Sequence, residues 1–228
     1  MFDMWREKFQ SLGIFVFKDA FKDDNFSGFC LYDEVYPIIY INNSMSFSRQ
    51  IFTLFHELYH LIMATSGIDT IRDEYIHFLE ETNQDIERKC NKFAQNFLVE
   101  NSDFVNECKV IDDIGENIDE NIAELANVYV VSKEVILYKL AENRRISIET
   151  FQKKLEQYQV EYRRRKSSEK RSGGNYYNTK ASYLGKKYLE IVFNKYSEGA
   201  IDMFKVAEYL NTNYKVALNM ESKFGDGL

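Results

Sequence analysis

The segment His56–His60, with the sequence HELYH, constrains the fold of this chain more than any other feature. An α-helix places residues four apart on one face, so both imidazoles would point at one site, with Glu57 beside them. The flanks favour such a helix, because Ser46 or Ser48 can cap its start and Gly67 can end it. Apolar residues recur there at helical spacing: Ile51, Phe52, Leu54, Phe55, Leu58, Leu61 and Ile62. The sequence therefore predicts a buried helix with one polar, functional face.

Two histidines and a carboxylate at this spacing are typical of a catalytic metal site, although a histidine pair can also be a surface feature of a helix. Catalytic zinc takes three protein ligands and leaves a position for water, whose pKa it lowers to about 7. Glu57 stands next to a ligand but not on the metal. It could take the proton of that water during attack on a peptide carbonyl and deliver it to the leaving amine.

A third ligand is expected from the next helical stretch. The apolar stripe of that stretch consists of Ile86, Cys90, Phe93, Ala94, Phe97 and Leu98. Glu87 stands in line with this stripe, and a carboxylate directed at a core is costly unless a cation pairs with it. A metal would supply that cation, although an Arg or Lys could do the same. Spacing alone also allows His77, Glu80 and Glu81.

In order and spacing, these residues resemble the ImmA/IrrE family of zinc-dependent endopeptidases. The likeness extends over roughly residues 10–140 and is carried by Ser27–Phe29, Pro37–Asn43, Arg49–Leu61 and Glu87–Leu98. The resemblance implies one zinc ion, or another divalent metal, bound by His56, His60 and Glu87. It also implies that Glu57 is the general base.

The same resemblance implies a class of partner. Members of this family act on helix-turn-helix repressors, often in prophages, mobile elements, stress responses or toxin–antitoxin pairs. Many also carry a DNA-binding helix-turn-helix ahead of the peptidase, whereas this chain begins almost directly at the peptidase, so we expect a separate repressor. Residues 173–185 resemble the tail of many members. The pair Val99-Glu100 departs from the family, which often has a proline there.

Composition indicates a cytoplasmic protein. With 228 residues, 45% of them apolar and 15% aromatic, the chain can bury one sizeable core and add a smaller tail. No run approaches the roughly 18 apolar residues of a membrane span, and the acidic start does not resemble a signal peptide. Cys30, Cys90 and Cys108 lack paired metal spacing, so we expect reduced thiols, with Cys90 as a small core residue.

The predicted fold class is α+β. We expect a zincin-like metallopeptidase domain at residues 1–160, mostly helical with a small antiparallel sheet. A basic, glycine-containing linker at 161–175 and a helical C-terminal extension at 176–228 would follow. Runs of aromatic and β-branched residues predict strands at 14–17, 28–32 and 37–41, after a helix at 3–12. In zinc peptidases, the edge of such a sheet can bind an extended substrate as an added strand.

Residues 121–140 permit a competing interpretation as a DNA-binding helix-turn-helix with Ser132 as a cap, and residues 206–213 echo it weakly. The charge argues against direct nucleic-acid binding, since the net charge is −7 and residues 100–124 are strongly acidic. A helical hairpin packed on the peptidase is the preferred interpretation. The only basic block, at 161–171, fits a solvated linker. It also fits a binding site for an acidic partner or for DNA.

The sequence thus predicts an endopeptidase that site-specifically cleaves or inactivates a regulatory protein. The alternative is a metal-containing antirepressor, or a toxin–antitoxin component, that inhibits its partner by contact and never cuts it. The group that would stabilise the oxyanion is left open among Arg49, Tyr59, Tyr75 and His77, which lie near the site in sequence.

Overall fold

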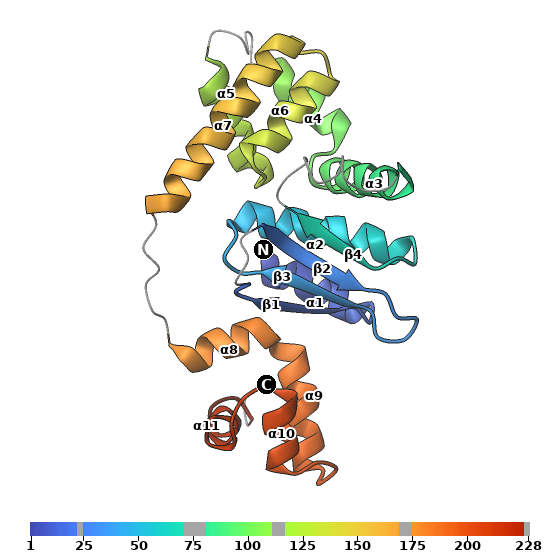
Figure 1. Ribbon diagram of the computed structural model, residues 1–228, viewed down its shortest axis with the longest axis vertical. Coiled ribbons are helices and arrows are strands. Elements are labelled where there is room, and N and C mark those ends of the chain that lie inside the picture. Colours follow the sequence, from blue (N-terminus) through green and yellow to red (C-terminus); the bar gives the residue numbers. More distant parts are fainter. Residues whose placement is uncertain (22–24, 71–80, 111–116, 169–174, 226–228) are drawn as a thin grey trace.

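A four-stranded β-sheet lies between two groups of helices in the computed structural model, which describes residues 1–21, 25–70, 81–110, 117–168 and 175–225 (Figure 1). The strands are β1 (Phe15–Asp19), β2 (Phe26–Leu31), β3 (Ile38–Asn42) and β4 (Gly67–Thr70). The helices are α1 (Phe2–Ser11), α2 (Phe47–Ile62), α3 (Glu81–Leu98), α4 (Asn101–Val110), α5 (Ile118–Tyr129), α6 (Lys133–Glu142), α7 (Ile148–Ser168), α8 (Tyr176–Leu184), α9 (Lys186–Ser197), α10 (Met203–Tyr209) and α11 (Tyr214–Phe224). The α+β class, mostly helical with a helical C-terminal part, is confirmed.

The sheet is mixed, with the strand order β1-β3-β2-β4. Strand β2 is antiparallel to both β3 and β4, as predicted for the sheet as a whole, but β1 runs parallel to β3. The prediction of a wholly antiparallel sheet is therefore wrong in one pairing. Strand β3 inserts between β1 and β2 instead of following β2 at the edge. Strand β4 was not predicted and forms the edge beside β2.

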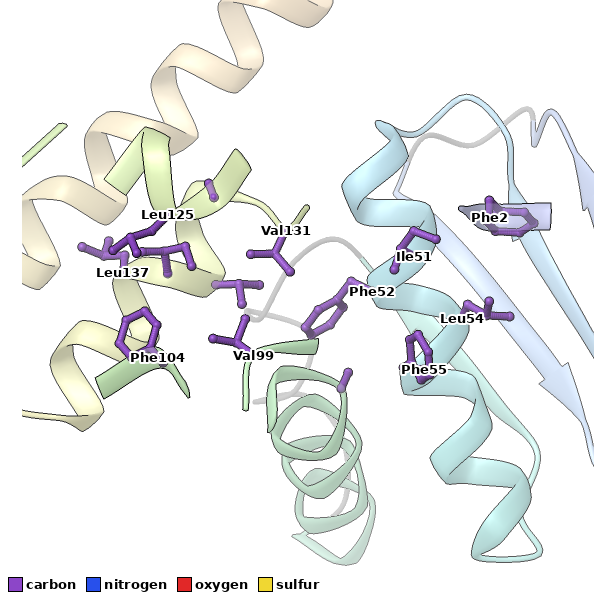
Figure 2. Close-up of a cluster of buried hydrophobic side chains, with 14 of the residues drawn as sticks. Phe2, Ile51, Phe52, Leu54, Phe55, Val99, Phe104, Leu125, Val131 and Leu137 are labelled. Atoms are coloured by element: carbon purple, nitrogen blue, oxygen red, sulfur yellow. The ribbon is translucent and has the colours of Figure 1, made fainter. Parts of the chain in front are cut away.

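Helix α2 crosses the inner face of the sheet and forms the centre of the main core. Its start is capped as predicted, since the Ser46 side chain accepts a hydrogen bond from the Arg49 backbone N–H. Figure 2 shows its apolar side chains in a continuous cluster that extends toward α4–α6. Leu54 and Phe55 are fully buried, which stabilises the fold by about 1.5–3 kcal/mol for each side chain.

The predicted end of this helix at Gly67 is wrong. Helix α2 stops at Ile62, and Ala64 takes the left-handed conformation with φ 53° in the turn that follows. Gly67 instead begins β4, where the absence of a Cβ allows a close approach to α2. A second close approach lies at Gly28 in β2, where a Cβ would meet the Thr53 side chain of α2 at 2.6 Å. These glycines let the sheet lie directly against α2.

Helices α5 and α6 form the hairpin that invited a DNA-binding interpretation. Val130 between them is left-handed, with φ 55°, and the Ser132 side chain caps α6 as predicted. However, α6 is buried on most of its surface, with Ile136, Leu137 and Leu140 fully enclosed by the main core. A recognition helix must expose a face to the major groove, so the structure supports the packing interpretation for residues 121–140.

The C-terminal helices α8–α11 have a separate apolar core and lie on the far side of the sheet from α2 (Figure 1). Buried Arg6 of α1 attaches them to the sheet. Its guanidinium donates hydrogen bonds to the carbonyl oxygens of Val16 in β1 and of Ser182 and Tyr183 in α8, at 2.9, 2.7 and 2.8 Å. The edge of the Tyr188 ring also packs against an aromatic residue of β1.

Helix α7 runs to Ser168, so the first part of the predicted linker at 161–175 has helical backbone. Residues 169–174 lie outside the described part of the chain. The weak helix-turn-helix pattern at 206–213 corresponds to α10, a turn with left-handed Asn211, and the Asn213 cap of α11. Throughout the residues that the structure describes, we find no helix long and apolar enough to cross a bilayer.

Candidate metal centre

Helix α2 carries three of the predicted site residues in its buried middle. His56, Glu57 and His60 are all at most 2% exposed. The one-turn spacing of the histidines sets their rings side by side, with centroids 5.2 Å apart. Polar groups are stable in such an enclosed position only if other groups compensate for the lost water.

Helix α3 supplies Glu87 opposite both rings. Its Oε2 lies 3.1 Å from His56 Nε2, and its Oε1 lies 3.3 Å from His60 Nε2. The structure therefore brings together His56, His60 and Glu87, as the sequence predicted. The rivals His77 and Glu80 fall outside the described residues, as does the side chain of Glu81.

Hydrogen bonds on the far side of each ring orient the histidines. His56 Nδ1 lies 2.9 Å from Asn91 Oδ1, and His60 Nδ1 lies 3.3 Å from Thr65 Oγ1. An amide oxygen can only accept, and the Thr65 hydroxyl already donates to the carbonyl oxygen of His60, so both groups accept from Nδ1. In the neutral form, each ring would direct the lone pair of Nε2 toward Glu87.

Three electron-rich groups thus converge on one point. Two nitrogen lone pairs and a carboxylate repel one another unless a positive charge, either a proton on a ring or a metal ion, lies between them. In a tetrahedral site with metal bonds of about 2.0–2.2 Å, neighbouring nitrogen and oxygen ligands lie about 3.3–3.5 Å apart. The observed separations of 3.1 and 3.3 Å are close to this range. The donor set and its spacing therefore fit a divalent metal ion.

The charge state of Glu87 agrees with this fit. Burial alone would raise the pKa of its carboxyl, but the hydrogen bonds and charges of His56 and His60 outweigh burial and lower the pKa to about 2. The carboxylate is therefore ionised at neutral pH. That is the form in which it can bind a metal.

Cys90 lies at the same site, although the sequence suggested a simple core residue. Its Sγ and one ring nitrogen from each of His56 and His60 all lie within 4.8 Å of one another. Cys90 follows Glu87 by three residues, so α3 presents both side chains to α2. The spacing in sequence could have suggested this placement, but an apolar stripe assigns the same position to packing.

A second thiol contacts Glu57. Burial and then the neighbouring Glu57 carboxylate, which also forms a hydrogen bond with the thiol, raise the pKa of Cys30 far above its ordinary value. The thiol is therefore protonated, and it donates to the carbonyl oxygen of Thr65 at 3.8 Å while lying beside Glu57. Sequence analysis missed this contact because Cys30 lies on β2, and only the packing of the sheet on α2 brings it to the site.

Strand β4 forms the wall of the site beside His60. A Cβ on Gly67 would lie 2.5 Å from the His60 ring, so only glycine permits this approach. Among the described residues, β4 pairs with β2 alone, and Ile68 is 61% exposed. No described strand therefore pairs with the outer edge of β4, next to the histidines.

Of the four candidates for an oxyanion stabiliser, two lie among the described residues. Arg49 lies two helical turns before His56, and its Nε donates a hydrogen bond to Ser27 Oγ of β2 at 2.9 Å. The Tyr59 ring packs 5.1 Å from the ring of Phe93 on α3. Tyr75 and His77 lie outside the described residues.

Comparison with known proteins agrees with this geometry. The family model described as Peptidase M78, IrrE N-terminal-like domain, matches residues 9–141. The matched region contains the whole sheet, α2, α3 and every site residue described above. No curated protein matches the sequence.

Proposed function

Since the chain belongs to the IrrE N-terminal-like domain family of metallopeptidases, we propose that it is a cytoplasmic metallo-endopeptidase that cleaves a regulatory protein at a specific site. The observation that carries this proposal is the convergence of His56, His60 and Glu87 beside the buried carboxylate of Glu57. We propose a helix-turn-helix repressor as the substrate, on the strength of the resemblance to the ImmA/IrrE family.

In this proposal His56, His60 and Glu87 bind one Zn²⁺ or another divalent metal. When bound, such an ion lowers the pKa of water to about 7 and polarises the carbonyl to be cleaved. Asn91 and Thr65 hold the two rings in the tautomer that offers Nε2, and outer hydrogen bonds of this kind fix the orientation of metal-binding histidines.

Glu57 is the proposed general base. It follows His56 directly and precedes His60 by three residues, so its carboxylate lies near the metal position without being one of the ligands. It would accept the proton of the attacking water and pass that proton to the leaving amine. The Cys30 thiol, which is held protonated, supports the carboxylate from the side of the sheet.

Specificity would come from the partner surface and from the outer edge of β4, with which no described strand pairs. An extended peptide that pairs with β4 would gain backbone hydrogen bonds and pass directly beside His60. Such a site selects substrates that can present an extended segment there. An unfolded generic protein such as casein should therefore be cut slowly compared with the true partner.

The variant Glu57→Gln tests this function against the antirepressor alternative. If the neighbouring gene encodes a helix-turn-helix protein, wild type with zinc should cut that protein into fragments detectable by mass, and Glu57→Gln should cut it about 10²–10⁴-fold more slowly. Glu124→Gln, an exposed position on α5, is the matched control and should cut at the wild-type rate. If Glu57→Gln inactivates the partner as well as wild type does, the protein acts by binding and the peptidase proposal is wrong.

A further inference from the structure

Cys90 has the position of a metal ligand and not only of a packing residue. It is fully buried, and its Sγ lies within 4.8 Å of one ring nitrogen from each histidine. Glu87 on the same face of α3 reaches the two Nε2 atoms from 3.1 and 3.3 Å. Helix α3 thus places Cys90 and Glu87 near the two histidines of α2.

The distances from Glu87 to the two histidines are close to those of a four-ligand centre. With a zinc–sulfur bond of about 2.3 Å and zinc–nitrogen bonds of about 2.0–2.1 Å, a tetrahedral ion holds sulfur about 3.5 Å from each nitrogen. Because the 4.8 Å limit exceeds this separation, Cys90 Sγ would have to move closer to the two nitrogens to complete that geometry. Thiolate is also a soft ligand that favours zinc over harder divalent ions.

The other two cysteines differ from Cys90. The Cys30 thiol is kept protonated by burial and by the Glu57 carboxylate, and it donates to the Thr65 carbonyl oxygen. Cys108 is also buried, but it lies on α4. Cys90 is therefore the one thiol that the structure groups with the two histidines among the described residues.

We propose that the Cys90 thiolate is a fourth protein ligand of the metal centre and closes it in the resting protein. This inference rests on the proposed function, since it requires the metal bound by His56, His60 and Glu87. Four protein ligands make a closed site, whereas hydrolysis needs a position for water. The thiol would release a proton when it binds the metal and take one up when it leaves, so displacement of Cys90 becomes part of activation.

Cobalt(II) provides the test, because a thiolate ligand gives cobalt an intense near-ultraviolet charge-transfer band that histidine and carboxylate ligands do not. Full-length protein stripped of metal and loaded with one cobalt per chain should show the band. Cys108→Ala should retain it as the control. Cys90→Ala should bind one cobalt, lose the band and cleave the partner faster than wild type. Cys90→Ser, which preserves the side-chain size, should lose the band as well if Cys90→Ala does not fold.

Two results would overturn the inference, and they are distinct from failure of the proposed function. A wild-type protein that binds one cobalt without the band would have a centre of histidine and carboxylate alone. A band that persists in both Cys90 variants would assign another thiol. Wild type that folds and binds no cobalt would instead contradict the metal centre itself, and this inference with it.

Discussion

Asn91 offers the sharpest test of how the candidate centre is built, because it touches a proposed ligand without being one. Its Oδ1 accepts from His56 Nδ1 at 2.9 Å, which fixes the tautomer and the ring orientation. Asn91→Leu preserves much of the side-chain volume but removes the acceptor. The ring can then rotate or move its hydrogen to Nε2, and either change interferes with metal binding.

The expected loss follows from the geometry of this contact. Removing a well-aligned outer hydrogen bond to a metal-binding histidine typically weakens metal affinity 10–100-fold, or by about 1.4–2.7 kcal/mol. Thr65→Val removes the corresponding contact to His60, which is longer at 3.3 Å, so its effect should be smaller, below about tenfold. Asn91→Asp retains an acceptor and should bind zinc at least as tightly as wild type.

Competition with a chromophoric chelator measures these zinc affinities directly. Asn127→Leu, on the exposed side of α5, controls for a general effect of replacing an amide with a leucine. Thermal unfolding of the metal-free variants checks that the fold persists, with a loss of about 1 kcal/mol expected for one hydrogen bond. Unchanged zinc affinity in Asn91→Leu, together with lost binding in His56→Ala, would refute the argument that Asn91 sets the tautomer.

Three further outcomes follow from the packing around the site. Gly67→Ala would place a Cβ 2.5 Å from the His60 ring, so zinc should bind at least tenfold more weakly, and wild-type affinity would contradict the close approach of β4. Arg6→Gln should lower the free energy of unfolding by about 3–5 kcal/mol in urea titrations and expose residues 175–225 to proteolysis, whereas exposed Lys8→Gln should do neither. Glu87 has a lowered pKa, so its ionised form stabilises the metal-free protein above pH 4.5, and this contribution is lost as the pH falls through about 2. The difference in unfolding free energy between wild type and Glu87→Gln should therefore shrink from pH 4.5 toward pH 2, and a constant difference would show that the pKa is not lowered.

Local sequence was enough to predict α2, the helix that carries His56, Glu57 and His60. The Ser46 cap and the apolar spacing of α2 act within a few residues of one another, and the structure reproduces both. The pairing of His56 with His60 follows from the same helical geometry. The assignment of Glu87 as the third ligand needed more than local sequence. Spacing alone left other residues possible, and the family resemblance favoured Glu87.

The features that sequence analysis missed depend on packing between distant elements. Cys30 and Cys90 reach the site only because β2 and α3 both lie against α2. Strand β4 consists of four residues without a clear alternating pattern, and it is a strand because it pairs with β2. The parallel register of β1 with β3 likewise depends on which strand inserts between which, a choice that no local pattern encodes.

The central claim is that His56, His60 and Glu87 form one metal centre. Diffraction data collected at the zinc absorption edge from crystals grown with Zn²⁺ test it most directly. We expect a single strong anomalous peak about 2.0–2.2 Å from His56 Nε2, His60 Nε2 and the Glu87 carboxylate. A well-ordered crystal with no peak at this position, or with zinc bound only elsewhere, would contradict the claim.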